Sequence, residues 1–242
     1  MFQDFTKLEC PFVRKTYQVN KEHWEAHGSK LQLRSPEVYL VTPQINPGYE
    51  WVLEHPDTFA CEKLDGTNVG LRTEKGRLME VQNRANPIDL LQVMRGPTFI
   101  IEGIFNAIAK GYVKETGLQF GELIGPKLQG NPLRLKNHIW YPFTKARQHL
   151  RYNSFNLHPK DFWSWSEWFR LGLHSRFMQK SKELEGEADF AEGLVFTNDT
   201  IGIPDHPRMA KLRRSMYPWF YWDKIEIYDI EPQWRNTPPV GA

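Results

Sequence analysis

The chain has 242 residues, of which 40% are hydrophobic and 25% charged, and its formal net charge is +2. This composition is that of a globular protein with a sizeable core and excludes wholesale disorder. Near-balanced charge excludes a polycationic nucleic-acid coat but is compatible with a local basic groove. Two cysteines make neither a disulfide framework nor a zinc knuckle, so we expect a reducing, cytoplasmic setting. No apolar stretch approaches the roughly 20 residues of a membrane helix, so no membrane partner is expected.

Prolines punctuate the first quarter of the chain, and one strand is predicted there, at residues 38–42. We expect residues 1–57 to form an N-terminal extension packed on a catalytic domain of residues 58–242. The catalytic domain opens with a predicted strand at residues 58–63. Residues 68–73 and 77–83 then flank Glu74-Lys75-Gly76, a sequence typical of a hairpin turn.

Helical and strand patterns mix in the rest of the chain. Thr98 is expected to cap a helix over residues 99–110, which carries a broad apolar face. Further helices are predicted at residues 164–171 and 176–184. Further strands are predicted at residues 118–124, 138–144, 194–197, 209–213 and 224–228. Strands that neighbour one another, with a few inserted helices, predict an α+β architecture.

Lys63 ends a predicted strand and is followed by the turn pair Asp65-Gly66. A surface turn is the ordinary interpretation of that pair. The alternative is a nucleophilic lysine, whose amine attacks only when it is neutral. Because Glu62 and Asp65 favour the charged ammonium, such a site would need cations or a metal from distant parts of the sequence.

Two cations and two carboxylates elsewhere could complete such a site. Lys211 and Arg213 alternate in a predicted strand, so they project from one face, which suits either a phosphate chain or a solvated strand edge. Glu122 and Glu192 each lie beside a glycine at a predicted strand. A carboxylate there either faces water or joins substrate phosphates around Mg²⁺.

Taken in order, these motifs resemble those of the covalent nucleotidyltransferases, the superfamily of ATP-dependent DNA ligases, RNA ligases and mRNA capping enzymes. The motifs are Lys63-x-Asp-Gly, Gly-Glu122, an aromatic strand, Glu192-Gly-Leu-Val-Phe and Lys211-x-Arg213. Residues 62–68 and 120–131 are most similar to the RNA ligases. The resemblance implies an ATP-grasp-like nucleotidyltransferase domain of antiparallel sheets with inserted helices. It also implies an ATP-dependent RNA ligase that seals 5′-phosphate and 3′-hydroxyl ends through a lysyl-AMP and an adenylylated 5′-phosphate end.

The same resemblance assigns the nucleotide site. Lys63 is the residue that carries AMP, and Glu62 presents backbone groups to the adenine. Asn68 lies on the nucleotide side, Arg84 on the next strand suits ribose or phosphate, and Glu122 binds ribose. The resemblance places the adenine-stacking aromatic at Phe143, with Trp140 and Tyr141 as rivals.

The resemblance also assigns the phosphate and metal residues. Glu192 matches the carboxylate that binds Mg²⁺ or Mn²⁺, and Lys211 and Arg213 match two lysines that meet the phosphates. Arg213 departs from the usual lysine. Because arginine keeps its charge and does not deprotonate, phosphate neutralisation should survive, whereas a role as proton donor is in doubt.

The expected partner is a nucleic acid with 5′-phosphate and 3′-hydroxyl ends, RNA being favoured, and the chain is expected to be a monomer. RNA is favoured because too few residues follow Arg213 for the five-stranded OB barrel that DNA ligases and capping enzymes carry. The alternatives are a minimal DNA nick ligase and a non-catalytic nucleotide- or RNA-binding module. Aromatic residues at 162–169 and 217–222 could stack bases, although their spacing favours a core helix and a core strand.

Overall fold

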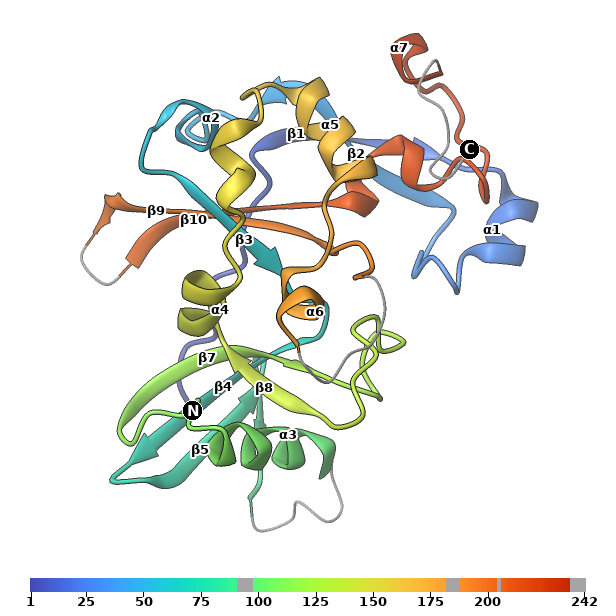
Figure 1. The fold of residues 1–242 in the computed structure, drawn as a ribbon. Helices are drawn as coiled ribbons and strands as arrows, with labels where there is room; N and C mark the ends of the chain where they lie inside the picture. The colour runs from blue at the N-terminus through green and yellow to red at the C-terminus, as the bar shows by residue number, and fades with distance from the viewer. Residues whose placement is uncertain (91–97, 182–187, 204–205, 236–242) are drawn as a thin grey trace. The chain divides into compact units, whose positions relative to one another are not determined.

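The computed structural model describes residues 1–90, 98–181, 188–203 and 206–235 (Figure 1). The chain divides into two compact units, each assembled from three stretches of sequence. Unit 1 consists of Met1–Lys7, Leu64–Tyr152 and Ser175–Asp189, and unit 2 consists of Leu8–Lys63, Asn153–His174 and Phe190–Ala242. Both units contain antiparallel sheet and helices, so the predicted α+β architecture is confirmed. The domain boundary after residue 57 stays a prediction.

Unit 1 is built on a five-stranded antiparallel sheet in the order β6-β5-β4-β7-β8. Its strands are β4 (Thr67–Glu74), β5 (Arg77–Asn83), β6 (Asn86–Ile88), β7 (Gly117–Ile124) and β8 (Ile139–Pro142). Its helices are α3 (Thr98–Ala109), α4 (Phe143–His149) and α6 (Arg176–Lys180). The predicted hairpin is confirmed: Lys75 and Gly76 form its two-residue turn, with φ of 49° and 76°.

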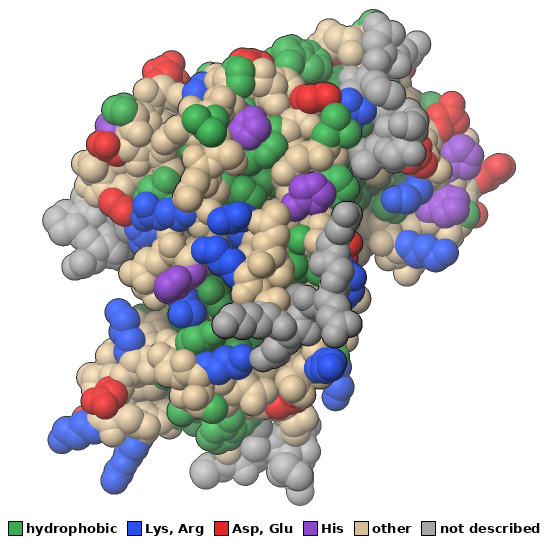
Figure 2. Space-filling model, viewed as in Figure 1, with side chains coloured by type: hydrophobic (Ala, Val, Ile, Leu, Met, Phe, Trp, Pro, Cys, Tyr) green, Lys and Arg blue, Asp and Glu red, His purple; other side chains and the backbone are tan. Residues whose placement is uncertain are grey.

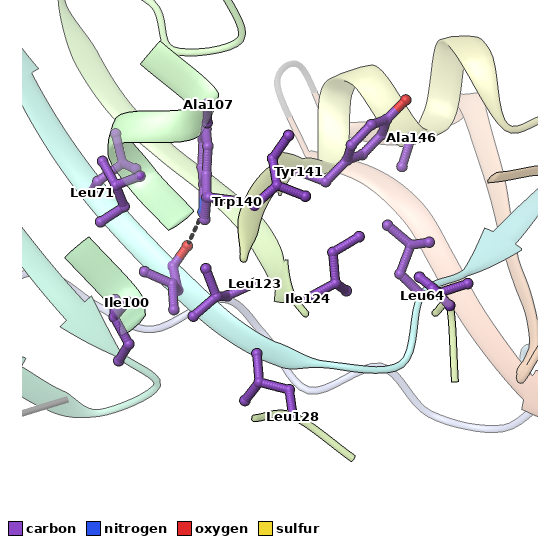
Figure 3. Close-up of a cluster of buried hydrophobic side chains, with 14 of the residues drawn as sticks. Leu64, Leu71, Ile100, Ala107, Leu123, Ile124, Leu128, Trp140, Tyr141 and Ala146 are labelled. Atoms are coloured by element: carbon purple, nitrogen blue, oxygen red, sulfur yellow. Dashed lines mark hydrogen bonds between the residues drawn. The ribbon is translucent and has the colours of Figure 1, made fainter. Parts of the chain in front are cut away.

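The core of unit 1 lies between this sheet and α3. Ile100, Ile104 and Ala107 on α3 are fully buried, and they join a cluster with side chains of β4, β7 and β8 (Figure 3). At its centre the indole N–H of Trp140 donates to the carbonyl of Val69 at 2.9 Å. The helix begins at Thr98 itself, so Thr98 is its first residue and the prediction that it caps the helix is wrong.

Unit 2 contains a two-stranded sheet of β1 (Phe12–Gln18) and β2 (Glu37–Ile45) and a three-stranded sheet in the order β10-β9-β3. The strands of the latter are β3 (Phe59–Lys63), β9 (Gly193–Ile203) and β10 (His206–Arg213). Its α-helices are α1 (Lys21–His27), α2 (Trp51–Glu54), α5 (Phe162–Leu171) and α7 (Pro232–Arg235). Short 3-10 helices are η2 (Asn153–Leu157), η3 (Arg214–Met216) and η4 (Pro218–Phe220).

Most aromatic rings of unit 2 are core residues. Trp165, Trp168 and Phe169 of α5 are buried, as their helical spacing predicts. The ring of Trp165 stacks on Phe196 of β9, with centroids 5.1 Å apart. This ring contact therefore packs α5 against β9.

Two strand predictions near the C-terminus are wrong. Residues 217–222 form η4 and its flanking turns, because Pro218 fixes its own φ and has no N–H for a ladder. The burial of Tyr217, Trp219 and Tyr221 is nevertheless as expected. Residues 224–228 form turns, and only Ile227 makes a bridge, to Val19. The helix expected at 176–184 is α6, and residues 182–184 lie outside the described residues.

Candidate active site

The pairing of β3, β9 and β10 brings the key residues of unit 2 into one row. Lys63 on β3 pairs with Gly193 on β9, and Gly193 pairs with Arg213 on β10. Residues that face each other across antiparallel strands project from the same side of the sheet. Lys63 and Arg213 therefore share a face, and Lys211, two residues before Arg213, shares it too.

Glu192 lies directly before Gly193 in the chain, and its carboxylate interacts with both Lys63 and Arg213. Its Oε2 accepts a short ion-paired hydrogen bond from Lys63 Nζ. Its Oε1 lies 4.0 Å from a terminal nitrogen of Arg213. Lys63 and Glu192 keep only 20% and 18% of their side-chain surface exposed, so the pair is largely screened from water. The structure thus assembles a lysine, a carboxylate and a guanidinium from positions far apart in the sequence.

Gly193 permits this close packing. A Cβ built on Gly193 would lie 2.1 Å from the carbonyl oxygen of Leu212, well inside ordinary contact distance.

Glu62 lies on the opposite face of the sheet from its neighbour Lys63: it pairs with Leu194 and is 2% exposed. Its proposed role toward adenine, through backbone groups, stays a prediction.

The surroundings of the cations on β10 have no signal in the sequence. The backbone N–H of Lys211 donates to the carbonyl of Glu9 at 2.9 Å, so the edge of β10 is covered by the N-terminal extension. Burial raises the pKa of the adjacent Cys10 to about 11, while Arg14, Arg213 and Lys211 act to lower it. At ordinary pH, Cys10 is therefore a neutral thiol among positive charges. No sequence motif marked this position.

Unit 1 holds Asn68 and Glu122, two of the predicted nucleotide residues, on its five-stranded sheet. Asn68 on β4 pairs with Glu122 on β7, and Glu122 pairs with Tyr141 on β8, so the three share one face. The amide nitrogen of Asn68 donates to Asp4 Oδ1 at 3.0 Å. Asp4 belongs to the first stretch of unit 1, whose contact with a predicted site residue had no signal in the sequence.

Phe143 is the first residue of α4, so the prediction that it lies in a strand is wrong. Pro142 ends β8 and occupies the cap position before α4, with φ of −65° and ψ of 142°. The Phe143 ring packs against Phe5, with centroids 4.8 Å apart. Residues 4 and 5 thus contact two residues that the resemblance assigns to the nucleotide.

Arg84 lies one residue beyond β5, so its predicted place on that strand is also wrong. It sits in the turn to β6 with φ of 52°, and its side chain is exposed. Its backbone N–H donates to the carbonyl of Asn68 at 3.0 Å, which holds the turn next to β4.

Each unit holds one predicted site residue with an unpaired polar atom. Asn68 Oδ1 in unit 1 and Arg213 Nε in unit 2 are buried and have no hydrogen-bond partner among the described residues. Buried polar atoms are seldom left unpaired. Taken separately, an amide acceptor suits the amines of ATP and a guanidinium donor suits its phosphates.

A divalent metal at this site would take most of its ligands from the substrate and from water. Within the described ranges no group of three or more His, Cys, Asp or Glu side chains could hold a metal ion. Mg²⁺ commonly binds through one or two carboxylates, water and substrate phosphates. Glu192 as a single carboxylate fits that pattern, but not a protein-built metal cage.

No helix in the same ranges is long and apolar enough to cross a membrane.

No protein-family model matches the chain, and no curated protein matches it. The solved structures that match include two of Naegleria gruberi RNA ligase. A lysine-to-alanine mutant without ligand has 20% identity and a TM-score of 0.29, with coverage of 65% of this chain and 49% of the ligase. An arginine-to-alanine mutant with ATP and Mn has 18% identity and a TM-score of 0.31, with coverage of 69% and 52%. The chain thus spans about half the length of these ligases, which belong to the family that its motifs resemble.

Proposed function

We propose that the chain is an ATP-dependent polynucleotide ligase, with RNA as the favoured substrate. The observation that carries the proposal is the row Lys63, Gly193 and Arg213, closed by the contacts of Glu192 with both charged side chains. A lysine held against a carboxylate and beside a guanidinium places a nucleophile, a carboxylate and a fixed positive charge within one small area.

In the proposed reaction, neutral Lys63 Nζ attacks the α-phosphorus of ATP. The nitrogen–phosphorus bond forms, the bond to pyrophosphate breaks, and the lysine proton passes to solvent. Arg213 and Lys211 neutralise charge that develops on the phosphates. A divalent metal bound with Glu192 would add further neutralisation and orient the phosphates.

Two transfers complete the reaction. An oxygen of the RNA 5′-phosphate attacks the AMP phosphorus and the bond to Lys63 breaks, while the departing nitrogen takes a proton from solvent, which restores the amine. The 3′-hydroxyl of the other end then attacks the 5′-phosphorus and loses its proton to solvent, a phosphodiester forms and AMP leaves. Each step is an in-line displacement that relies on positioning and charge.

The residues of unit 1 are proposed to hold the nucleoside. Glu122 would accept hydrogen bonds from ribose hydroxyls, Asn68 would contact the nucleotide, and Phe143 would stack on adenine. Phe143 lies at the start of a helix rather than in a strand, which leaves Tyr141, on the same face as Glu122, as a rival.

The test is intact-protein mass spectrometry after incubation with ATP and Mg²⁺, followed by peptide mapping. We expect an added mass of one AMP on Lys63, absent in Lys63→Ala. Lys15→Ala is the matched control, because Lys15 also pairs with a glutamate, Glu231, at 3.0 Å. AMP retained in Lys63→Ala would refute the nucleophile assignment. No adduct on the wild-type protein, once preloaded AMP is excluded, would refute the proposed function.

A further inference from the structure

A basic cavity in unit 1 adjoins the proposed nucleotide residues through Tyr141, which lines it. Its volume is about 410 Å³, and it is lined by residues of α3, α4, α6 and the segment that leads into β8. This size is within the roughly 300–1,000 Å³ of small-ligand sites. In Figure 2, Lys and Arg side chains gather over α4 and near α6.

Lysines supply the charge of this lining. Lys110, Lys136, Lys145 and Lys180 contribute to it, and among the described residues that line the cavity there is no Asp or Glu. The effect reaches His149, whose pKa is lowered by desolvation, by Lys145 and by Lys180. Like charges gathered around a cavity repel one another, and a polyanion in the cavity would relieve that repulsion.

Aromatic rings form one wall of the same cavity. Tyr141 contacts Tyr112 and Phe177 edge-on, with centroids 5.6 Å and 5.5 Å apart. Lys145 Nζ lies 4.4 Å from the centroid of the Tyr112 ring. A cation above a ring beside an open cavity combines the two contacts that single-stranded nucleic acids use, phosphate pairing and base stacking.

His138 is not a ligand-binding group here, although it lines the cavity. Its Nδ1 is 3.0 Å from Glu102, and its Nε2 accepts from the backbone N–H of Lys127 at 3.1 Å. Both ring nitrogens are therefore engaged inside the protein. The positive charge of the lining comes from the lysines.

We infer that this cavity, with its lysine rim and tyrosine-lined wall, binds the backbone and a base of single-stranded RNA beyond the reacting ends. Stacking rings favour a nucleic acid over an acidic polypeptide, whose carboxylates would use the lysines but not the rings. The inference rests on the proposed function for its choice of substrate. Apart from Tyr141, the residues of this contact site lie outside the ligase motifs.

The test uses the full chain and a short fluorescein-labelled single-stranded RNA with a 5′-phosphate. Fluorescence anisotropy gives Kd at several salt concentrations for wild type, for Lys110→Gln/Lys136→Gln and for Tyr112→Leu. The control is Lys75→Gln/Lys114→Gln, which removes the same charge from exposed positions of unit 1 outside the cavity. Labelling of each protein with α-phosphate-labelled ATP is measured in parallel.

We expect the cavity double variant to weaken binding about tenfold or more and to reduce the slope of log Kd against log salt by roughly 1.4, since each single-strand phosphate contact contributes about 0.7. Tyr112→Leu should weaken binding roughly five-fold or more with the slope unchanged. The control variant should bind like wild type. All variants should form lysyl-AMP normally.

Equal losses in the cavity variant and the control, or none in either, would overturn the inference. So would displacement of the RNA by polyglutamate at matched charge concentration, which would indicate a site for acidic polypeptides. These failures are distinguishable from failure of the proposed function. The latter is judged by adenylylation of Lys63 alone, and the cavity variants leave that residue untouched.

Discussion

Substitution of Gly193 by alanine should separate β9 from β10. The new Cβ would meet the Leu212 carbonyl oxygen at 2.1 Å, so the strands must part by about 1.3 Å to reach the 3.4 Å of ordinary contact. The movement would stretch the ladder bonds around Gly193 and the next pair, each worth about 1 kcal/mol net. Overpacking adds roughly 1–3 kcal/mol. We therefore expect the free energy of unfolding to fall by about 3–5 kcal/mol.

Urea unfolding followed by tryptophan fluorescence measures this loss, with far-UV circular dichroism as a second probe. Gly48→Ala in the same unit is the control. Gly48 has φ of 85° and nothing within 4 Å of a built Cβ. Alanine there should lower the free energy of unfolding by about 1 kcal/mol, because only the left-handed backbone conformation is unfavourable for it. A loss in Gly193→Ala no greater than that in Gly48→Ala would refute the steric argument. A larger loss of stability in Gly193→Ala, together with reduced adenylylation, would show that the Lys63–Gly193–Arg213 row is needed for adenylylation.

Three other substitutions have defined outcomes. Tyr217→Phe removes a buried hydroxyl with no partner among the described residues, so stability at pH 7 should hold or rise by about 1 kcal/mol. Burial raises the pKa of Tyr217 well above 10, so wild-type stability should fall as pH rises past 10, a fall that urea titrations of the variant should not show. Burial lowers the pKa of Lys160 to about 8 from 10.5, so stability should rise across that interval, and Lys160→Met should flatten the rise. Phe5→Ala removes the ring that packs on Phe143, so the Phe143 ring becomes free to stack on adenine and KM for ATP should fall several-fold. Phe2 packs on Phe120, so the control Phe2→Ala should leave KM unchanged. An unchanged KM in both variants would contradict adenine stacking on Phe143.

Local chemistry made part of the fold predictable. The β4–β5 hairpin follows from Lys75-Gly76, because a two-residue hairpin turn needs positive φ at both positions. The helical spacing of Trp165 and Phe169 correctly indicates a buried face. In both cases the signal lies within a few residues, where backbone preference and periodicity act directly.

Long-range pairing and proline account for most of what the sequence did not predict. Lys63 and Glu192 are 129 positions apart, and only the register of β3 on β9 brings them into contact. The motifs marked both residues, but not their ion pair. The strand expected through Phe143 ends at Pro142, which has no N–H to extend the ladder and suits a helix start. The contact of Asp4 with Asn68 joins segments with no shared pattern.

The division of each unit into three stretches of chain has a consequence for how the protein is made. The chain passes from one unit to the other directly after Lys63, so the strand that presents the lysine and the turn that follows it belong to different units. Unit 1 lacks part of itself until residue 189 has been synthesised, and unit 2 needs strands that come later still. Neither unit can complete its core while the ribosome is still adding the middle of the chain. Folding must therefore wait for distant segments, which predicts slow, largely post-translational acquisition of structure and a need for protection from aggregation in the interval.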